Sequence, residues 1–354
     1  MSLFTQQRIH IQPARYAPGE PVKPALDAFL QHGWFRMRQE VFTTHFLQFN
    51  GLFYDAVWLR IPLYNWQPTT GQQKLLKRFG SRLHVQTAPY AYEPALDELM
   101  QAYRNHVTFD AAQNIDELLG ETYACLFDTQ MLQLYYDDRL VAVGFFDKGQ
   151  KAAAGISSIY HPDFAHMSLG KLLLLYKMLH CQQQGVQYFY PGYIVPGHIR
   201  FTYKELIAPA AAEYLDIMRH RWLPQQQLQF EQLPMQRMWH KLYSLQAALV
   251  NFGIAATLHR YRMFDATLWF NMGQNLLPYP LVLQVGRAAA DHSILLVVYN
   301  VTNHLFQLLA CTPVVSPVTS AILEQADLEN ELLTITHKYW EVATEQEAVR
   351  HLLG

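Results

Sequence analysis

Apolar runs separated by short polar turns predict a sheet in the middle of the chain. Asp137 and Asp138 form a turn pair between two such runs, so residues 132–146 are predicted to be a β-hairpin. Lys148 and Gly149 supply a second turn, which leads into a third strand over residues 152–160. We therefore expect three neighbouring antiparallel strands here.

A helix is predicted to follow this sheet, over residues 169–184. Ser168 stands at the N-cap position and Gly185 at the C-terminal stop, and residues 186–190 then form a buried strand. The first-turn N–H groups of Leu169, Gly170 and Lys171 are predicted to be unpaired and to favour an anion. Taken alone, however, such a helix is more often only a capped helix packed on a sheet.

The same signals predict elements in the rest of the chain. Strands are expected at residues 34–38, 44–50, 52–63, 83–87, 281–285, 294–301 and 304–314, with a hairpin turn at Asn50-Gly51. Helices are expected at residues 25–32, 71–80, 93–107, 114–119, 235–259, 321–333 and 344–353.

Composition indicates a globular protein of more than one domain. The chain has 354 residues, of which 51% are hydrophobic and 16% charged, so it can bury more than one core. The net charge of −2 gives no overall field that attracts nucleic acid, so any RNA contact must depend on a local patch. Residues 1–16 lack the apolar core of a signal peptide, and polar residues interrupt the most apolar stretch, 294–315.

One local patch of this kind lies in the predicted helix 71–80. Lys74, Lys77 and Arg78 share one helix face, and Arg82 follows directly. A solvated basic face and a contact with tRNA phosphates are both open interpretations of these residues.

Cysteine and histidine spacing gives no metal site. Cys125, Cys181 and Cys311 are far apart and indicate reduced thiols in a cytoplasmic protein. None of the 16 histidines shows the spacing of a known zinc motif.

Residues 137–216 resemble the C-terminal domain of the arginyl-/leucyl-tRNA–protein transferases, which move an amino acid from tRNA onto a protein N-terminus. The order of strands and helix resembles the middle of an acyl-CoA N-acyltransferase (GNAT-type) domain. The matching positions are Asp147 at the end of the family's "ffD" strand, Tyr160, Pro162 and Asp163 in Y-x-P-D, Ser168, Leu169 and Gly170 in S-L-G, Tyr190, Gly192 and Tyr193 in Y-x-G-Y, and Tyr203, Lys204 and Pro209 in Y-K…P.

The N-terminal part resembles the same transferases less closely. Residues 32–36, 59–62, 71–79 and 103–106 follow the family's order, but its metal- or cluster-binding cysteines have no counterpart, because residues 41–59 contain no Cys. We therefore expect no metal and no cofactor, with aminoacyl-tRNA as co-substrate. With the resemblance, the tRNA interpretation of Lys74, Lys77, Arg78 and Arg82 becomes the favoured one.

The resemblance also implies roles for single residues. Ser168, Leu169, Gly170 and Lys171 would hold a phosphate or ribose of the tRNA acceptor end, and Lys204 and Arg200 would add charge. Asp147 or Tyr203 would take up a proton or hold the acceptor amine. Tyr160, Tyr190 and Tyr193 would line the pocket or stack on the terminal adenine, although sheet packing is expected for two of these three. Arg200-Phe201 stands where the family usually has Lys-Met, which leaves the choice of amino acid open.

The predicted fold is therefore mixed α/β (α+β), with two GNAT-like lobes and a C-terminal α/β appendage. We expect domains at residues 1–125, 126–222 and 223–354, the last without an assigned role. The expected partners are tRNA and a protein or peptide N-terminus, without a membrane, in the cytoplasm. An acyl-CoA-dependent N-acyltransferase and a non-catalytic relative that binds tRNA or peptide are the alternatives.

Overall fold

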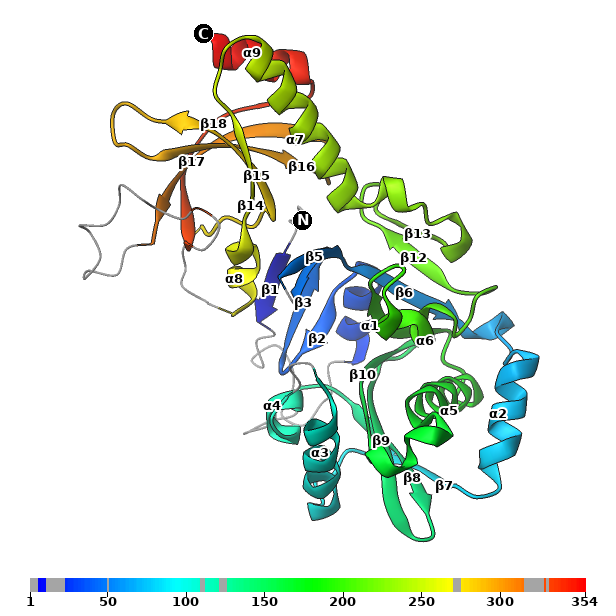
Figure 1. Cartoon of the computed structure of the whole chain (residues 1–354). Coiled ribbons are helices and arrows are strands. Elements are labelled where there is room, and N and C mark those ends of the chain that lie inside the picture. Colours follow the sequence, from blue (N-terminus) through cyan, green and yellow to red (C-terminus); the bar gives the residue numbers. More distant parts are fainter. Residues whose placement is uncertain are drawn as a thin grey trace.

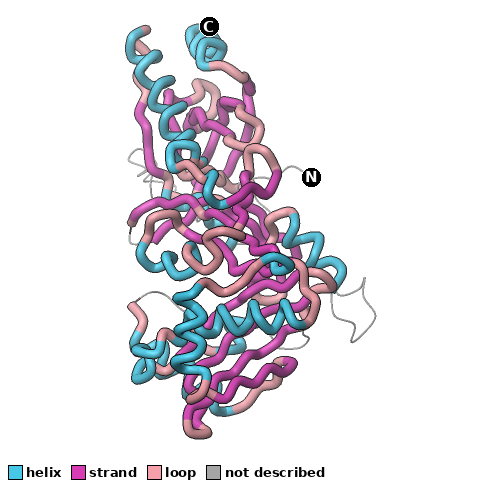
Figure 2. Tube along the Cα trace, turned by 90° about the vertical axis from the view of Figure 1, so that its right-hand side faces the viewer, coloured by secondary structure: helices cyan, strands magenta, loops and turns pink. Residues whose placement is uncertain are grey.

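Two β-sheets placed one after the other along the molecule carry most of its elements (Figure 1). Seen from the side, the C-terminal sheet and its helices lie above the larger central sheet (Figure 2). The computed structural model describes residues 6–10, 23–49, 51–108, 112–120, 126–269, 275–314, 328 and 331–354.

The helices and strands agree with most of the sequence-based expectations. The strands are β1 Gln6–His10, β2 Phe35–Met37, β3 Glu40–Thr44, β4 Phe46–Phe49, β5 Leu52–Asp55, β6 Val57–Pro62, β7 His84–Pro89, β8 Thr129–Tyr136, β9 Arg139–Lys148, β10 Ala152–Tyr160, β11 Tyr188–Ile194, β12 Glu213–Asp216, β13 Arg221–Pro224, β14 Thr257–Arg260, β15 Leu281–Arg287, β16 Ile294–Asn300, β17 Leu305–Pro313 and β18 Leu333–Val342. The helices are α1 Lys23–Gln31, α2 Thr70–Gly80, α3 Pro94–His106, α4 Ile115–Leu119, α5 Leu169–Gln183, α6 Thr202–Glu205, α7 Pro234–Asn251, α8 Ala266–Trp269 and α9 Glu345–Leu353.

The central sheet has the order β13-β12-β6-β11-β10-β9-β8-β7. The predicted hairpin is confirmed as β8 and β9, with Asp137 and Asp138 both at positive φ in the turn between them. β10 pairs antiparallel with β9, and α5 then crosses over to β11, which runs parallel to β10. The predicted mixed α/β, GNAT-like core is therefore present. It consists of the antiparallel strands β8, β9 and β10, the crossover helix α5 and the parallel strand β11.

Alternating side chains of the central strands cover both faces of the sheet. Leu132, Ala142 and Ala153 pack with α5 on one face, in a cluster that also includes residues of α2. Their neighbours Met131 and Val143 point to the other face and pack with α3 and α4. The period of two along each strand therefore puts α5 against one side of β8, β9 and β10.

β10 and β11 separate after a short paired stretch, and this separation positions the site. Their last paired residues are Ala154 and Tyr190. Beyond that pair, β10 continues along β9 with a bulge between Gly155 and Ser157, while β11 continues along β6 with a register shift between Phe189 and Gly192. The two strands thus diverge and leave a V-shaped opening in the middle of the sheet.

N-terminal and core segments share the central sheet. β6 pairs with β11 and β7 pairs with β8, so strands from both sides of the expected boundary at residue 125 belong to one sheet. The small sheet β1-β3-β2 and the hairpin β4-β5 are the N-terminal strands outside it. The division into three domains stays a prediction.

The C-terminal segment forms a five-stranded sheet, β14-β15-β16-β17-β18, covered by α7. The sequence-based helix 235–259 is wrong at its end, because α7 stops at Asn251, Gly253 takes a positive φ, and residues 257–260 pair with β15 as β14. The expected helix 321–333 lies largely outside the described residues, and Leu333 starts the edge strand β18, which the sequence analysis missed. Within the described part of the chain, no helix is long and apolar enough to cross a membrane.

Candidate functional site

A cavity of about 490 Å³ opens beside the first turn of α5. We call it the large cavity. Its lining comes from α3, β10, the start of α5 and the segment that contains α6, and it consists of Tyr103, Ser158, Tyr160, Ala165, Ser168, Leu169, Gly170, Lys171, Arg200, Phe201, Tyr203 and Lys204. Eight of the residues selected from the sequence therefore meet at one cavity.

The first turn of α5 offers two backbone N–H groups to this cavity. Within the described residues, the amides of Leu169 and Gly170 donate no hydrogen bond, whereas the amide of Lys171 donates to the Ser168 carbonyl at 3.0 Å. The expectation of three unpaired amides is thus wrong for Lys171. Ser168 occupies the N-cap position, but it has φ 56° and its hydroxyl makes no capping bond. The left-handed backbone at Ser168 turns the chain out of the preceding 3₁₀ helix, Pro162–Met167, and into α5.

The large cavity has a positive lining. Lys171, Arg200 and Lys204 contribute to it, and none of its lining residues is a carboxylate. Burial lowers the pKa of Lys204 to about 8, and within the described part of the chain no carboxylate lies within ion-pair distance of its ammonium. This ammonium lies over the ring of Tyr193, 5.9 Å from the ring centroid. A lining of two amides and three cations is suited to an anionic guest.

Three tyrosines, Tyr103, Tyr160 and Tyr203, also line the large cavity. The rings of Tyr103 and Tyr160 meet edge to face with centroids 5.4 Å apart. Burial raises the pKa of Tyr103 to about 12 and that of Tyr203 to about 12. Both tyrosines are therefore neutral at neutral pH and can donate hydrogen bonds, and the proton role expected of Tyr203 stays a prediction.

A second cavity, of about 200 Å³, lies in the opening between β10 and β11. We call it the small cavity; Phe201 and Lys204 line both cavities. Its other lining residues are Phe35, Arg36, Phe42, Trp58, Asp147, Ala154, Gly155, Ile156, Pro191, Gly192 and Tyr193. Gly192 has φ 91°, and a Cβ atom at this position would lie 3.4 Å from Nζ of Lys204, so the family's glycine lets the lysine lie close to the backbone.

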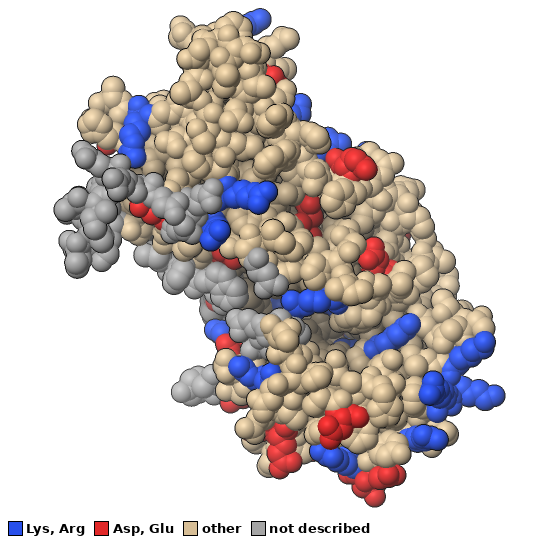
Figure 3. Space-filling model, in the orientation of Figure 1, with Lys and Arg blue, Asp and Glu red and all other residues tan. Residues whose placement is uncertain are grey.

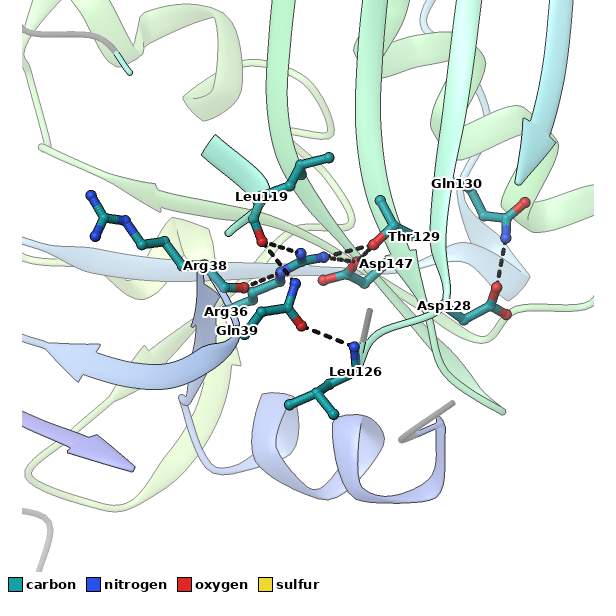
Figure 4. Close-up of polar contacts among 9 residues, drawn as sticks. All are labelled: Arg36, Arg38, Gln39, Leu119, Leu126, Asp128, Thr129, Gln130 and Asp147. Atoms are coloured by element: carbon teal, nitrogen blue, oxygen red, sulfur yellow. Dashed lines mark hydrogen bonds and ion pairs between the residues drawn. The ribbon is translucent and has the colours of Figure 1, made fainter. Parts of the chain in front are cut away.

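Asp147 lies in the small cavity and is held by Arg36 (Figure 4). A guanidinium nitrogen of Arg36 lies 2.8 Å from Oδ1 of Asp147, and the Thr129 hydroxyl donates to the same oxygen at 2.9 Å. Arg36 also donates to the carbonyl of Leu119 at 2.6 Å and to that of Arg38. A buried carboxylate in such a network is suited to fixing the β2 segment on the sheet, and the proton role expected of Asp147 stays a prediction.

The tyrosines selected from the sequence lie in three different places. Tyr160 lines the large cavity and Tyr193 the small one. Tyr190 lines neither and packs in the core against Phe35 and Trp222. Tyr193 also packs against this core, with its ring edge to face with that of Trp58 at 5.1 Å, which agrees with the expectation of sheet packing for two of the three.

The basic residues of α2 form an exposed patch outside both cavities. Lys74, Lys77, Arg78 and Arg82 are all exposed, and among the described residues none of them has a carboxylate partner. Figure 3 shows Lys and Arg gathered on the right-hand edge, over the place that α2 occupies in Figure 1. α2 packs next to α5, and its Gln72 donates to the carbonyl of Ile207, just after α6. The patch therefore lies on elements that adjoin the large cavity.

The sequence analysis missed four residues of this region. Arg36, Tyr103 and Ser158 line the cavities, and Lys177 lies buried beneath Ser158, with its ammonium nitrogen 3.2 Å from the Ser158 hydroxyl. A lysine inside the apolar run of α5 was the available signal for Lys177. Arg36 and Tyr103 come from segments whose contact with the core only the fold reveals.

Comparison with known proteins identifies the same segment. Residues 72–214 match the family model of the arginine-tRNA-protein transferase C-terminus. An aspartate/glutamate leucyltransferase of Leptospira interrogans is 25% identical over 174 residues, which cover 48% of this chain and 68% of that protein. A Vibrio cholerae protein of the same name is 29% identical over 171 residues, which cover 46% of this chain and 69% of that protein.

A solved structure is also similar at low identity. The ribosomal-protein-S18-alanine N-acetyltransferase of Escherichia coli aligns with a TM-score of 0.22 and 18% identity, over 29% of this chain and 63% of that one. This likeness is too small to support an argument. The family match instead spans most of α2 and every lining residue of the large cavity. It leaves residues 1–71 and 215–354 outside, and with them Phe35, Arg36, Phe42 and Trp58 of the small cavity. Residues 72–214 of this chain are therefore similar to the C-terminal part of the arginine-tRNA-protein transferases.

Proposed function

We propose that this protein transfers an amino acid from the 3′ end of a charged tRNA to the N-terminal amine of a protein, and that the large cavity is the reaction site. The observation that supports the proposal best is the cavity itself. It combines the two unpaired amides of α5 with Lys171, Arg200 and Lys204, and it contains no carboxylate. The negatively charged phosphate of an acceptor end matches this lining in charge.

The reaction suits a site that contains neither an evident nucleophile nor a metal motif. The ester on the tRNA is already activated, and an N-terminal amine has a pKa of about 7.7–8.0, so part of it is neutral at cellular pH. The amine nitrogen forms a bond to the ester carbonyl carbon, the bond to the tRNA 3′-oxygen breaks, and one proton moves from nitrogen to that oxygen. The protein must position both groups, exclude water and help to move this proton.

In this proposal, Leu169 and Gly170 bind the terminal phosphate through their amides, and Lys171 and Arg200 add charge from either side. Tyr160 lies against the terminal adenine. Lys204, between the two cavities, is near enough to both to stabilise negative charge as it develops on the ester oxygen. The small cavity is then the place for the side chain of the transferred residue.

Two relatives named aspartate/glutamate leucyltransferase suggest the substrates. We propose leucine as the transferred amino acid and proteins that begin with Asp or Glu as acceptors. The exposed basic patch of α2 binds the tRNA backbone, and the protein works in the cytoplasm, where charged tRNA is found.

An acyl-CoA-dependent N-acyltransferase is the second candidate. The same amides at the start of α5 suit the pyrophosphate of coenzyme A, so the helix terminus alone does not separate the two functions. Thermal melting with acetyl-CoA separates the two functions. A rise in Tm that saturates with the acetyl-CoA concentration favours the acyl-CoA-dependent enzyme, and an unchanged Tm favours the tRNA-dependent one.

A transfer assay tests the proposal. The full chain is incubated with tRNA charged with radiolabelled Leu or Arg and with peptides that begin with Asp, Glu or Ala. We expect label on the Asp and Glu peptides and none on the Ala peptide. Specific binding of tRNA without transfer would instead favour a non-catalytic relative, and absence of transfer from every charged tRNA would contradict the proposal.

A further inference from the structure

A lysine is buried beneath the large cavity without a counter-ion. Lys177 is 2% exposed and lies in α5, on the side that packs against β9 and β10. Its ammonium nitrogen lies 3.2 Å from the carbonyl oxygen of Ser157, 3.5 Å from that of Phe145 and 3.2 Å from the hydroxyl of Ser158. In the described residues, no carboxylate pairs with it.

The number of partners matches a neutral amine. A neutral lysine has two N–H donors and one lone pair, and the site offers two carbonyl acceptors and one hydroxyl that can donate. A buried ammonium without a carboxylate is costly, so the neutral form is favoured. Gly144 on β9 supports this placement, because a Cβ atom there would lie only 3.1 Å from the lysine nitrogen.

The Ser158 hydroxyl connects this lysine to the cavity. Ser158 lines the large cavity on one side and contacts Lys177 on the other. The backbone bulge between Gly155 and Ser157 precedes it directly. If the hydroxyl donates its hydrogen to Lys177, the lone pairs of its oxygen are free to accept a proton from the cavity.

We infer that Lys177 is the proton acceptor of the transfer reaction and that it acts through the Ser158 hydroxyl. The inference rests on the proposed function. As the amine nitrogen attacks the ester carbonyl, Ser158 takes a proton from that nitrogen and passes its own proton to Lys177. The same route then returns the proton to the tRNA 3′-oxygen as the C–O bond breaks, so serine and lysine end in their starting states.

The electrostatic surroundings suit this role. Burial, together with the smaller effect of the nearby charge of Lys204 on α6, lowers the pKa of Lys177 to about 7. Burial raises the pKa of the Cys181 thiol, one turn along α5, to about 12, so this group stays uncharged at the working pH. The contacts from β9 and β10 are carbonyl and hydroxyl groups. Lys177 therefore changes its charge near the working pH.

The test is the single-turnover rate of transfer between pH 6 and 9, at saturating charged tRNA, for the wild type, Lys177→Met, Lys177→Arg and Ser158→Ala. We expect about a 100-fold loss in each variant, with loss of the ionisation near pH 7 and little change in the apparent affinity for charged tRNA. Arginine does not restore the rate, because it stays charged. Cys181→Ala, a buried change on the same helix, should keep the wild-type pH profile.

The outcomes separate the possible failures. A folded Lys177→Met or Ser158→Ala variant with a wild-type rate and pH profile would overturn the inference and leave the proposed function standing. If Lys177→Met does not fold, Ser158→Ala decides, because it removes the connecting hydroxyl and leaves the lysine in place. A wild type that transfers from no charged tRNA would overturn both proposals.

Discussion

Arg36 and Asp147 form a buried ion pair across 111 residues of sequence, with 2.8 Å between the guanidinium nitrogen and the carboxylate oxygen. The two side chains are 2% and 0% exposed. Arg36 lies on β2 and Asp147 near the end of β9, so the pair joins the N-terminal sheet to the core (Figure 4). The last residue of the family's "ffD" motif therefore has a structural partner that the motif itself does not contain.

Arg36→Met should destabilise the protein by about 3–5 kcal/mol, because it leaves a carboxylate buried without its cation. Asp147→Asn should cost less, since the amide adds no charge. Denaturant unfolding of both variants and of the double variant measures the coupling between them. Equal effects of the two single variants and no coupling would show that the ion pair does not matter for stability.

Lys177 should make stability depend on pH. Its pKa is lowered from 10.5 to about 7 in the folded protein, so between these values the unfolded chain binds more protons. The free energy of unfolding should therefore rise as the pH rises from 7 towards 10.5, by an amount on the order of a few kcal/mol.

Lys177→Met should remove most of this rise. Lys204, with its pKa lowered to about 8, contributes in the same direction and accounts for the remainder. Urea unfolding at pH 7, 8 and 9 checks the difference between wild type and variant. A rise of equal size in both proteins would mean that Lys177 keeps its proton in the folded state.

The basic patch should set the salt dependence of tRNA binding. Changing Lys74, Lys77 and Arg78 to Gln removes up to three phosphate contacts, so the slope of log K against log salt should become shallower by about 2. The matched control changes three exposed cations of the C-terminal sheet and its helix, Arg287, Lys338 and Arg350. Equal slopes for the patch variant, the control and the wild type would mean that α2 does not contact tRNA.

Asp55 should stabilise the junction between the N-terminal hairpin and the C-terminal segment. Its carboxylate accepts a hydrogen bond of 2.8 Å from the amide of Met235, the second residue of α7. Asp55 at the end of β5 therefore caps the N-terminus of a helix that is 180 residues away in sequence. Asp55→Ala should lower stability by about 1–2 kcal/mol, and Asp55→Asn by less, because asparagine also caps helices. Melting temperatures of the two variants check this order, and equal values would contradict it.

The sequence predicted the core well because its signals are local. Asp137 and Asp138 mark the hairpin turn, and Ser168 and Gly185 bound α5 within two residues, since turn and cap chemistry depend on near neighbours. The meeting of Ser168–Lys171 with Lys204 was also predictable, although only through the resemblance to a family.

Long-range packing set the limits of that prediction. α7 ends earlier than expected because residues 257–260 pair with β15. Apolar residues at helical spacing in the sequence cannot reveal such a strand pairing. Asp147 was selected as a reactive group because it ends the family's ffD motif, and its ion pair with Arg36 was not foreseen because Arg36 is distant in sequence. Lys177 was overlooked because a lysine in a helix is usually exposed to solvent. Only the packing of α5 against the central sheet shows that the Lys177 side chain is buried.

The transfer rate of Lys204→Met tests the central claim most directly, because Lys204 lines both cavities and lies against Gly192. Methionine keeps the length of the side chain and removes its charge, so melting and circular dichroism should match the wild type. We predict a single-turnover rate of transfer to a peptide with an N-terminal Asp that is lower by at least about 100-fold. A folded variant whose rate stays within twofold of the wild type would contradict the assignment of the reaction to these cavities.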